Sequence, residues 1–126
     1  MEKKYPIYVP FEYINEDLME HGDVITWCNE NLSESSSNAL FLSLDDIYIL
    51  QYNSEVLDII NEENGGMLQA GEDDWILSTE VKLRIFKRLK KYAETIEDGR
   101  EKDILEGLLR LLDISIRTKK NIYFIF

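Results

Sequence analysis

Hydrophobic and polar residues follow two different periods along the chain, and the helical period is clearest in the last third. Between residues 78 and 98, apolar side chains recur every three or four positions and fall within an arc of about 140°. Residues 100–117 show the same spacing, and Gly99 separates the two segments. The pattern predicts a helical hairpin over 78–98 and 100–117, because so short a link makes antiparallel neighbours.

A period of two, typical of strands, marks both ends of the chain. Apolar positions alternate with others from Tyr5 to Tyr13, as in a strand with one buried face. The missing amide hydrogens of Pro6 and Pro10 fall on the same side, which predicts an edge strand or one that pairs on one side only. Residues 122–126 have no polar position and predict a strand covered on both faces, inside the sheet.

Apolar runs at 39–44 and 47–52 flank Asp45 and Asp46 in the middle of the chain. Their length favours two strands joined by a turn at these aspartates, so we expect a β-hairpin. A single helix from residue 45 to 64 is the competing prediction.

Shorter helical segments complete the middle. Asn15 can cap a helical start that Gly22 is expected to break, before a helix resumes at Asp23. A further helix is expected between Ser54 and Gly65. Short strands around the acidic residues 72–74 are expected to end at residues 75–77.

The predicted order is strand, helix, strands, helix, strands, two helices and a final strand. It indicates an α+β domain with helices packed on a small mixed, mostly antiparallel sheet. The 126 residues fit one domain, 1–126, and with 44% hydrophobic residues we expect a folded core despite a net charge of −11.

Charge is distributed very unevenly along the chain. Residues 5–81 contain 17 aspartates and glutamates and no lysine or arginine, where average usage would place roughly nine cations. Residues 82–126 contain 12 cations and 7 acids. An acidic protein lacks the cations that bind phosphates, so we expect no direct binding to nucleic acid and none to anionic membranes.

Five cations gather on the outer face of the first C-terminal helix, and their role has three possible interpretations. They can be solvated, can form a second binding surface, or can neutralise the acidic half from within. They are Arg84, Lys87, Arg88, Lys90 and Lys91.

Catalytic motifs are missing from the sequence. His21 and Cys28 are its single histidine and cysteine, so one chain cannot assemble a His/Cys zinc site, and no nucleophile or phosphate-loop motif is present. We expect no enzyme and no cofactor, although paired carboxylates on turns leave a magnesium site or an acid–base mechanism as an alternative. With a lone cysteine and no signal peptide, we expect a cytoplasmic protein.

A surface made only for solubility mixes both signs of charge, so one with acids alone is expected to match a basic partner. Aromatic residues among those acids are the natural anchors, although core packing is the alternative for Trp75 and Tyr48. The candidate partner-binding residues are Asp45, Asp46, Tyr48, Glu62, Glu63, Glu72, Asp73, Asp74 and Trp75.

In size, charge and α+β character, the whole chain resembles the immunity proteins of bacterial toxin systems, including those of contact-dependent growth inhibition. The resemblance implies a non-catalytic inhibitor that binds one cognate toxin domain, often a nuclease with a basic cleft. The alternative is another protein-binding module, either an adaptor or an acidic inhibitor that mimics nucleic acid. A mimic should carry acids spaced like phosphates along an extended face.

Overall fold

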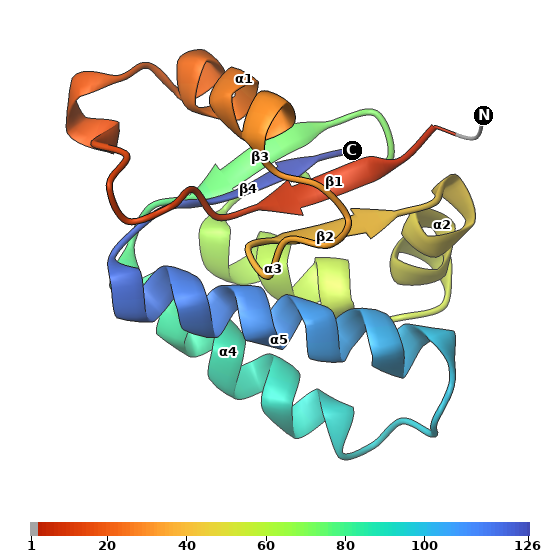
Figure 1. Ribbon diagram of the computed structural model, residues 1–126. Coiled ribbons are helices and arrows are strands. Elements are labelled where there is room, and N and C mark those ends of the chain that lie inside the picture. The colour runs from red at the N-terminus through yellow and green to blue at the C-terminus, as the bar shows by residue number, and fades with distance from the viewer. Residues whose placement is uncertain (1–2) are drawn as a thin grey trace.

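The computed structural model describes residues 3–126, and its centre is a four-stranded sheet (Figure 1). The strands lie in the order β2-β1-β4-β3, and all three ladders are antiparallel. Their bounds are β1 Tyr5–Tyr8, β2 Ala39–Leu42, β3 Asp73–Ile76 and β4 Ile122–Ile125. The predicted α+β class with a final C-terminal strand is therefore confirmed.

Helices cover both faces of this sheet. Helix α1 lies on one face, and α3, α4 and α5 lie across the other, with α2 at the end of β2 (Figure 1). Each face has its own hydrophobic cluster, the smaller one beneath α1. The helices are η1 Glu16–Leu18, α1 His21–Asn31, α2 Leu44–Tyr52, α3 Val56–Asn64, α4 Thr79–Ala93 and α5 Arg100–Thr118.

The final strand β4 occupies the interior of the sheet, as its apolar sequence predicts. It pairs with β1 on one side and β3 on the other. Tyr123 is buried in the cluster beneath α1, while Phe124 is buried in the opposite cluster. Both faces of β4 are therefore covered, which explains why no polar residue interrupts it.

The prediction of β1 as an edge strand was wrong, because β1 pairs with both β2 and β4. The prolines do not place β1 at an edge of the sheet, but they limit its pairing on one side. Val9 donates its amide to Asn38 on the β2 side, so Pro6 and Pro10 face the β4 side. Four residue pairs join β1 to β2, but only Ile7 and Tyr8 are paired with β4, so the prolines shorten one ladder.

The helical hairpin is confirmed, with one difference in length. Ser78 caps α4 by accepting a hydrogen bond from the Val81 amide, as the sequence predicts. Helix α4 ends at Ala93 and not near residue 98. The reason lies at Thr95, which donates both its amide and its hydroxyl to the Tyr92 carbonyl and closes the helix with a tight turn.

The predicted β-hairpin at Asp45 and Asp46 was wrong, because β2 ends at Leu42 and helix α2 begins two residues later. Ser43 and Asp46 form a capping box in which each side chain accepts a hydrogen bond from the backbone amide of the other, at 3.1 and 2.9 Å. The reciprocal bonds satisfy free amides at the start of the helix, so the two aspartates begin a helix where a turn was expected.

Other helix boundaries follow the sequence more closely. Asn15 caps η1 as predicted, and Gly65 ends α3 in the left-handed conformation with φ 69°. The break expected at Gly22 was wrong, because this residue lies in the first turn of α1. In residues 3–126 we find no helix with the length and apolar character needed to cross a membrane.

Candidate functional site

The acidic half of the chain exposes its carboxylates to solvent with few cations nearby. Of the 17 acids between residues 5 and 81, Asp46 is buried, Glu16, Glu63 and Asp74 are half-buried, and thirteen are exposed. Among residues 3–126, Glu62 is the one exposed acid of this half that forms an ion pair. The other twelve carry uncompensated negative charge.

Helix α1 presents three of these acids in line. Glu20 precedes the helix as its N-cap, and Asp23 and Glu30 project from its exposed side, because seven residues make nearly two full turns. Seven residues advance about 10.5 Å along the axis. The acids therefore form a row of negative charge along the exposed side of α1.

An aromatic stack brings the start of α1 to the sheet edge. His21 lies over Trp75 of β3, with ring centroids 4.4 Å apart and planes 21° apart. Asp73 is two residues before Trp75, so it lies on the same face of the sheet as α1, and it is exposed. We call Glu20, Asp23, Glu30 and Asp73 the acidic face.

Asp74 points to the opposite side of β3 and is held there. Its carboxylate accepts hydrogen bonds from the Trp75 amide at 2.8 Å and the Asn64 side chain at 3.5 Å. The Asn64 side chain also donates to the Trp75 carbonyl at 3.1 Å. These bonds satisfy the Trp75 amide and carbonyl on the unpaired side of the edge strand β3, so Asp74 has a structural role.

Asp46 is also a structural residue, although the sequence placed it among the partner-binding candidates. It is only 6% exposed, and Arg100 of α5 donates to both of its carboxylate oxygens at 2.8 and 2.7 Å. The hydrogen bonds from Arg100 lower the pKa of the Asp46 carboxyl to about 2. The pair ties α2 to α5.

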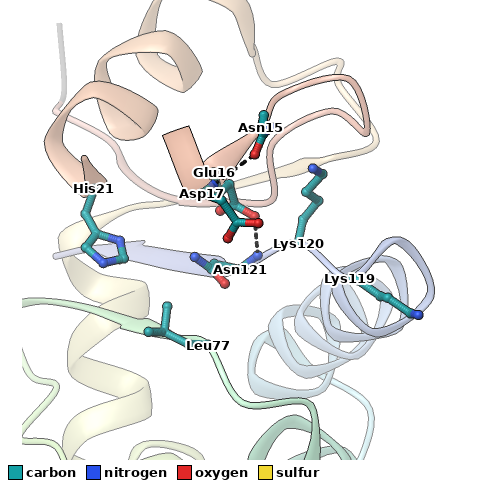
Figure 2. A pocket seen from close by; sticks show the side chains of 8 residues that line it. All are labelled: Asn15, Glu16, Asp17, His21, Leu77, Lys119, Lys120 and Asn121. Carbon is teal, nitrogen blue, oxygen red and sulfur yellow. Dashed lines mark hydrogen bonds between the residues drawn. The ribbon is translucent and has the colours of Figure 1, made fainter. Parts of the chain in front are cut away.

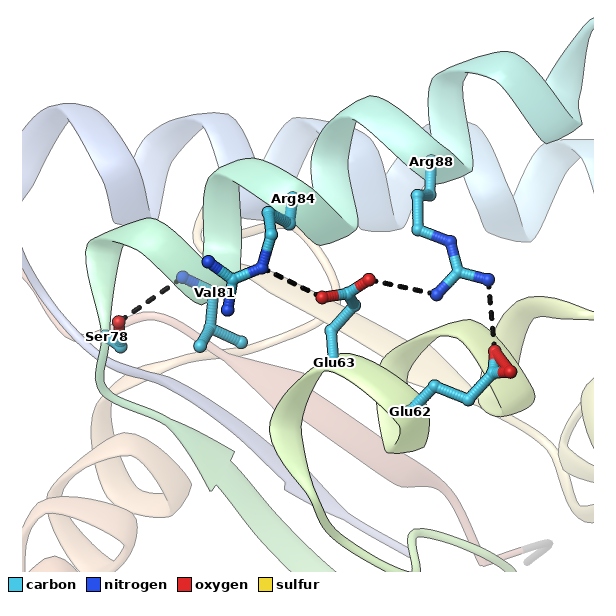
Figure 3. A network of polar contacts seen from close by, with 6 residues as sticks. All are labelled: Glu62, Glu63, Ser78, Val81, Arg84 and Arg88. Carbon is cyan, nitrogen blue, oxygen red and sulfur yellow. Dashed lines mark hydrogen bonds and ion pairs between the residues drawn. The ribbon is translucent and has the colours of Figure 1, made fainter.

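Glu62 and Glu63 on α3 form ion pairs with the cationic helix α4 (Figure 3). Glu63 lies between Arg84 and Arg88, at 2.9 and 3.0 Å, and Arg88 also reaches Glu62 at 3.0 Å. The bond from Arg84, followed by that from Arg88, lowers the pKa of Glu63. Internal neutralisation is thus the role of these two arginines, while Lys87, Lys90 and Lys91 are exposed.

The nine candidates therefore do not form one surface. On α2, Asp45 is exposed and Tyr48 is 41% exposed, with its ring 5.9 Å from that of Tyr52. Glu72 and Asp73 are exposed at the β3 end, where Trp75 is half-buried. Glu20, Asp23 and Glu30 were missed, although the seven-residue spacing of the last two on a predicted helix was a usable signal.

A pocket of about 480 Å³ opens between η1 and the turn before β4 (Figure 2). At its wall, Glu16 accepts hydrogen bonds from the Tyr123 hydroxyl at 2.5 Å and the Asn121 amide at 2.9 Å. Both carboxylate oxygens are thus engaged, and burial raises the pKa of Tyr123. Nearby, the buried Lys82 donates to the Lys120 carbonyl at 2.7 Å, and burial lowers its pKa.

The bonds of Glu16 join η1 to β4, and those of Lys82 and Ser115 to the Lys120 carbonyl join α4 and α5 to the turn before β4. Within residues 3–126, no group of three or more His, Cys, Asp or Glu side chains is placed to hold a metal ion.

No family model and no curated protein matches the chain. Among solved structures, the fold is similar to that of the Neisseria DNA mimic protein DMP12. The TM-score is 0.75 with 17% sequence identity, and the match covers 98% of this chain and all of that one. The likeness establishes the fold.

The prediction about partners was wrong in setting nucleic acid aside. It expected a cognate toxin or another basic protein, with no direct binding to nucleic acid. The solved structure with a similar fold is named as a DNA mimic protein, so nucleic acid cannot be left out of account when a partner is considered. The charge argument treated DNA as a ligand, which an acidic protein repels, and mimicry of nucleic acid was given only as the alternative function.

Proposed function

We propose that the protein is an acidic, non-catalytic inhibitor that imitates DNA and occupies the DNA-binding surface of another protein. The supporting observation is the acidic face, where carboxylates on α1 and β3 are exposed and unpaired among residues 3–126. A DNA-binding surface is lined with cations placed to contact phosphates. Exposed carboxylates that have no cation of their own can pair with the same cations.

The shared fold with a DNA mimic protein supports the same proposal from a second direction. Residues 5–81 contain no lysine or arginine, so every arginine and lysine that can pair with their acids lies outside this segment. Arg84, Arg88 and Arg100 neutralise acids that support the fold and leave the acidic face unpaired. Binding is stoichiometric and requires no cofactor.

The test is capture followed by displacement with DNA. The tagged protein is incubated with lysate of its own organism, and the retained proteins are challenged with short duplex DNA. We expect one basic protein to be released by the duplex, because both ligands use one surface. Retained proteins that no duplex displaces would refute the mimicry.

A matched pair of variants distinguishes binding by the acidic face from an effect of net charge alone. The triple variant Asp23→Asn, Glu30→Gln, Asp73→Asn removes three charges from the acidic face and should abolish capture. The control Asp45→Asn, Asp58→Asn, Glu80→Gln removes three exposed, unpaired charges elsewhere among the described residues and should retain it. Equal loss in both variants would contradict the assignment to the acidic face.

A further inference from the structure

An aromatic cluster lies beside Asp23 and Glu30 of the acidic face, although its residues were not among the predicted binders. Trp27 of α1 contacts Phe11 and Tyr13 edge-on, with ring centroids 5.4 and 5.9 Å apart and planes at 74° and 88°. Phe11 and Tyr13 are themselves 5.9 Å apart. We call these three residues the aromatic cluster.

The cluster is partly open to solvent. Tyr13 is 74% exposed, and Phe11 and Trp27 are half-buried against the core beneath α1. An exposed aromatic side chain held by two others loses little conformational freedom when a partner covers it. Tyrosine and tryptophan in such positions are typical binding hot spots.

Carboxylates stand on both sides of Trp27. Asp23 precedes it by four residues and Glu30 follows it by three, so both are its neighbours on the surface of α1. Neither forms an ion pair among residues 3–126. Arg117, which shares a small pocket with Phe11, is itself bonded to Asp113 at 3.0 Å.

We infer that the aromatic cluster, flanked by Asp23 and Glu30, is a docking site for arginine side chains of the partner. A guanidinium group is planar, stacks on aromatic rings and donates several hydrogen bonds to carboxylates. The ammonium group of lysine is not planar and has no paired donors in a fixed geometry. The inference rests on the proposed function and adds the residue type that the site recognises.

Charge decides between the possible occupants of this surface. A second copy of the chain in a symmetric contact would bring Asp23 and Glu30 against the same acids, which costs free energy. In any other contact, the exposed cations of α4 that carry no ion pair among the described residues are the lysines Lys87, Lys90 and Lys91, which have no planar guanidinium group. Nucleic acid bases could stack on the rings, but the flanking carboxylates repel the phosphates. A protein surface that carries arginines can stack a guanidinium group on the rings and pair it with the carboxylates.

The intrinsic fluorescence of Trp27 gives a direct test without the natural partner. The chain has two tryptophans, so Trp75→Phe leaves Trp27 as the single reporter. Two synthetic peptides of equal length, one alternating arginine with glycine and one alternating lysine with glycine, are the probes. We expect the arginine peptide to change Trp27 emission and to bind several-fold more tightly than the lysine peptide.

Equal affinity of the two peptides, with Trp27 emission unchanged, would overturn the inference and leave charge alone as the attraction. In a second measurement, Tyr13→Ser should weaken binding of the captured partner about tenfold. Tyr52→Ser, which changes a tyrosine that is 70% exposed on α2, is the matched control and should leave that affinity unchanged. Equal loss in both tyrosine variants would also overturn the inference.

The two proposals can fail separately. If DNA displaces the captured partner but Tyr13→Ser binds it as tightly as the unchanged protein, DNA mimicry stands and the arginine site is refuted. If no captured protein is displaced by DNA, the proposed function itself fails.

Discussion

His21 stacks on Trp75, with ring centroids 4.4 Å apart and planes 21° apart. The contact joins the first residue of α1 to the edge strand β3, which lies more than fifty residues later in the chain. Through it, the acids at the start of α1 and the acid at the start of β3 belong to one face of the molecule. The stack therefore positions the surface that we propose as the DNA mimic.

Replacing Trp75 by Ala should lower the free energy of unfolding by about 2–3 kcal/mol. The value is below that of a fully buried tryptophan because this side chain is half-buried. Urea unfolding measures it, and Trp75→Phe, which retains an aromatic ring against His21, should lose less. Unchanged stability in Trp75→Ala would show that the residue does not contribute to packing.

Asp73 and Asp74 should respond differently to neutralisation. Asp73→Asn should slow association with the partner and flatten its salt dependence without a change in stability, because the carboxylate is exposed. Asp74→Asn should cost about 1 kcal/mol of stability, because this carboxylate accepts the Trp75 amide. Stopped-flow mixing measures the rates and urea unfolding the stabilities. The same rate in Asp73→Asn at low salt would remove that residue from the interface.

Acid should destabilise the protein partly through Asp46. Its pKa is about 2 in the folded state against 3.8 ordinarily, so it contributes stability above pH 3.8 that is lost as the pH falls toward 2. The contribution is about 1–2 kcal/mol, since Arg100 is half exposed to solvent.

Asp46→Asn should therefore be less stable at pH 7 and should lose less stability between pH 4 and pH 2.5. Urea unfolding at these pH values checks this, with Asp45→Asn as the exposed neighbouring control. A parallel pH dependence in Asp46→Asn and the unchanged protein would refute the role of the pair.

Alkaline pH should destabilise the protein through Cys28 and Tyr8, which are buried between α1 and the sheet. Burial raises the pKa of Cys28 to about 12 and that of Tyr8 to about 12. The unfolded chain releases these protons near pH 8.5 and pH 10, so stability falls as the pH rises beyond about 9. Between pH 8.5 and 10, Cys28→Ala should show a shallower fall than the unchanged protein in urea unfolding.

The thiol of Cys28 offers an independent check of the same burial. A thiol reagent should label the native protein slowly, at the rate of opening, and the urea-unfolded protein at once. Rapid labelling of the folded state would show that α1 does not pack this residue against the sheet as the structure describes.

Local patterns in the sequence predicted much of the fold correctly. The hairpin of α4 and α5 followed from apolar residues at helical spacing, and the interior place of β4 followed from a run without polar residues. Both features depend on residues only a few positions apart in the chain. The apolar face of a helix and a fully buried strand can therefore be predicted from the local sequence.

One failure of the sequence reasoning shows the limit of local patterns. Residues 47–52 are apolar enough for either a strand or a helix, and the capping box of Ser43 with Asp46 favours the helix. The buried carboxylate of Asp46 is then stabilised by Arg100, 54 residues away. No local sequence pattern predicts that Arg100 is the partner of Asp46.

By itself, the sequence determined that the acidic half has no cation of its own between residues 5 and 81. Only the tertiary structure decided which acids remain unpaired: Glu62, Glu63 and Asp46 are neutralised by arginines of the C-terminal half, while Asp23 and Glu30 stay free among the described residues. The physical reason is distance, because an ion pair forms within about 4 Å in space and such contacts depend on how distant segments pack.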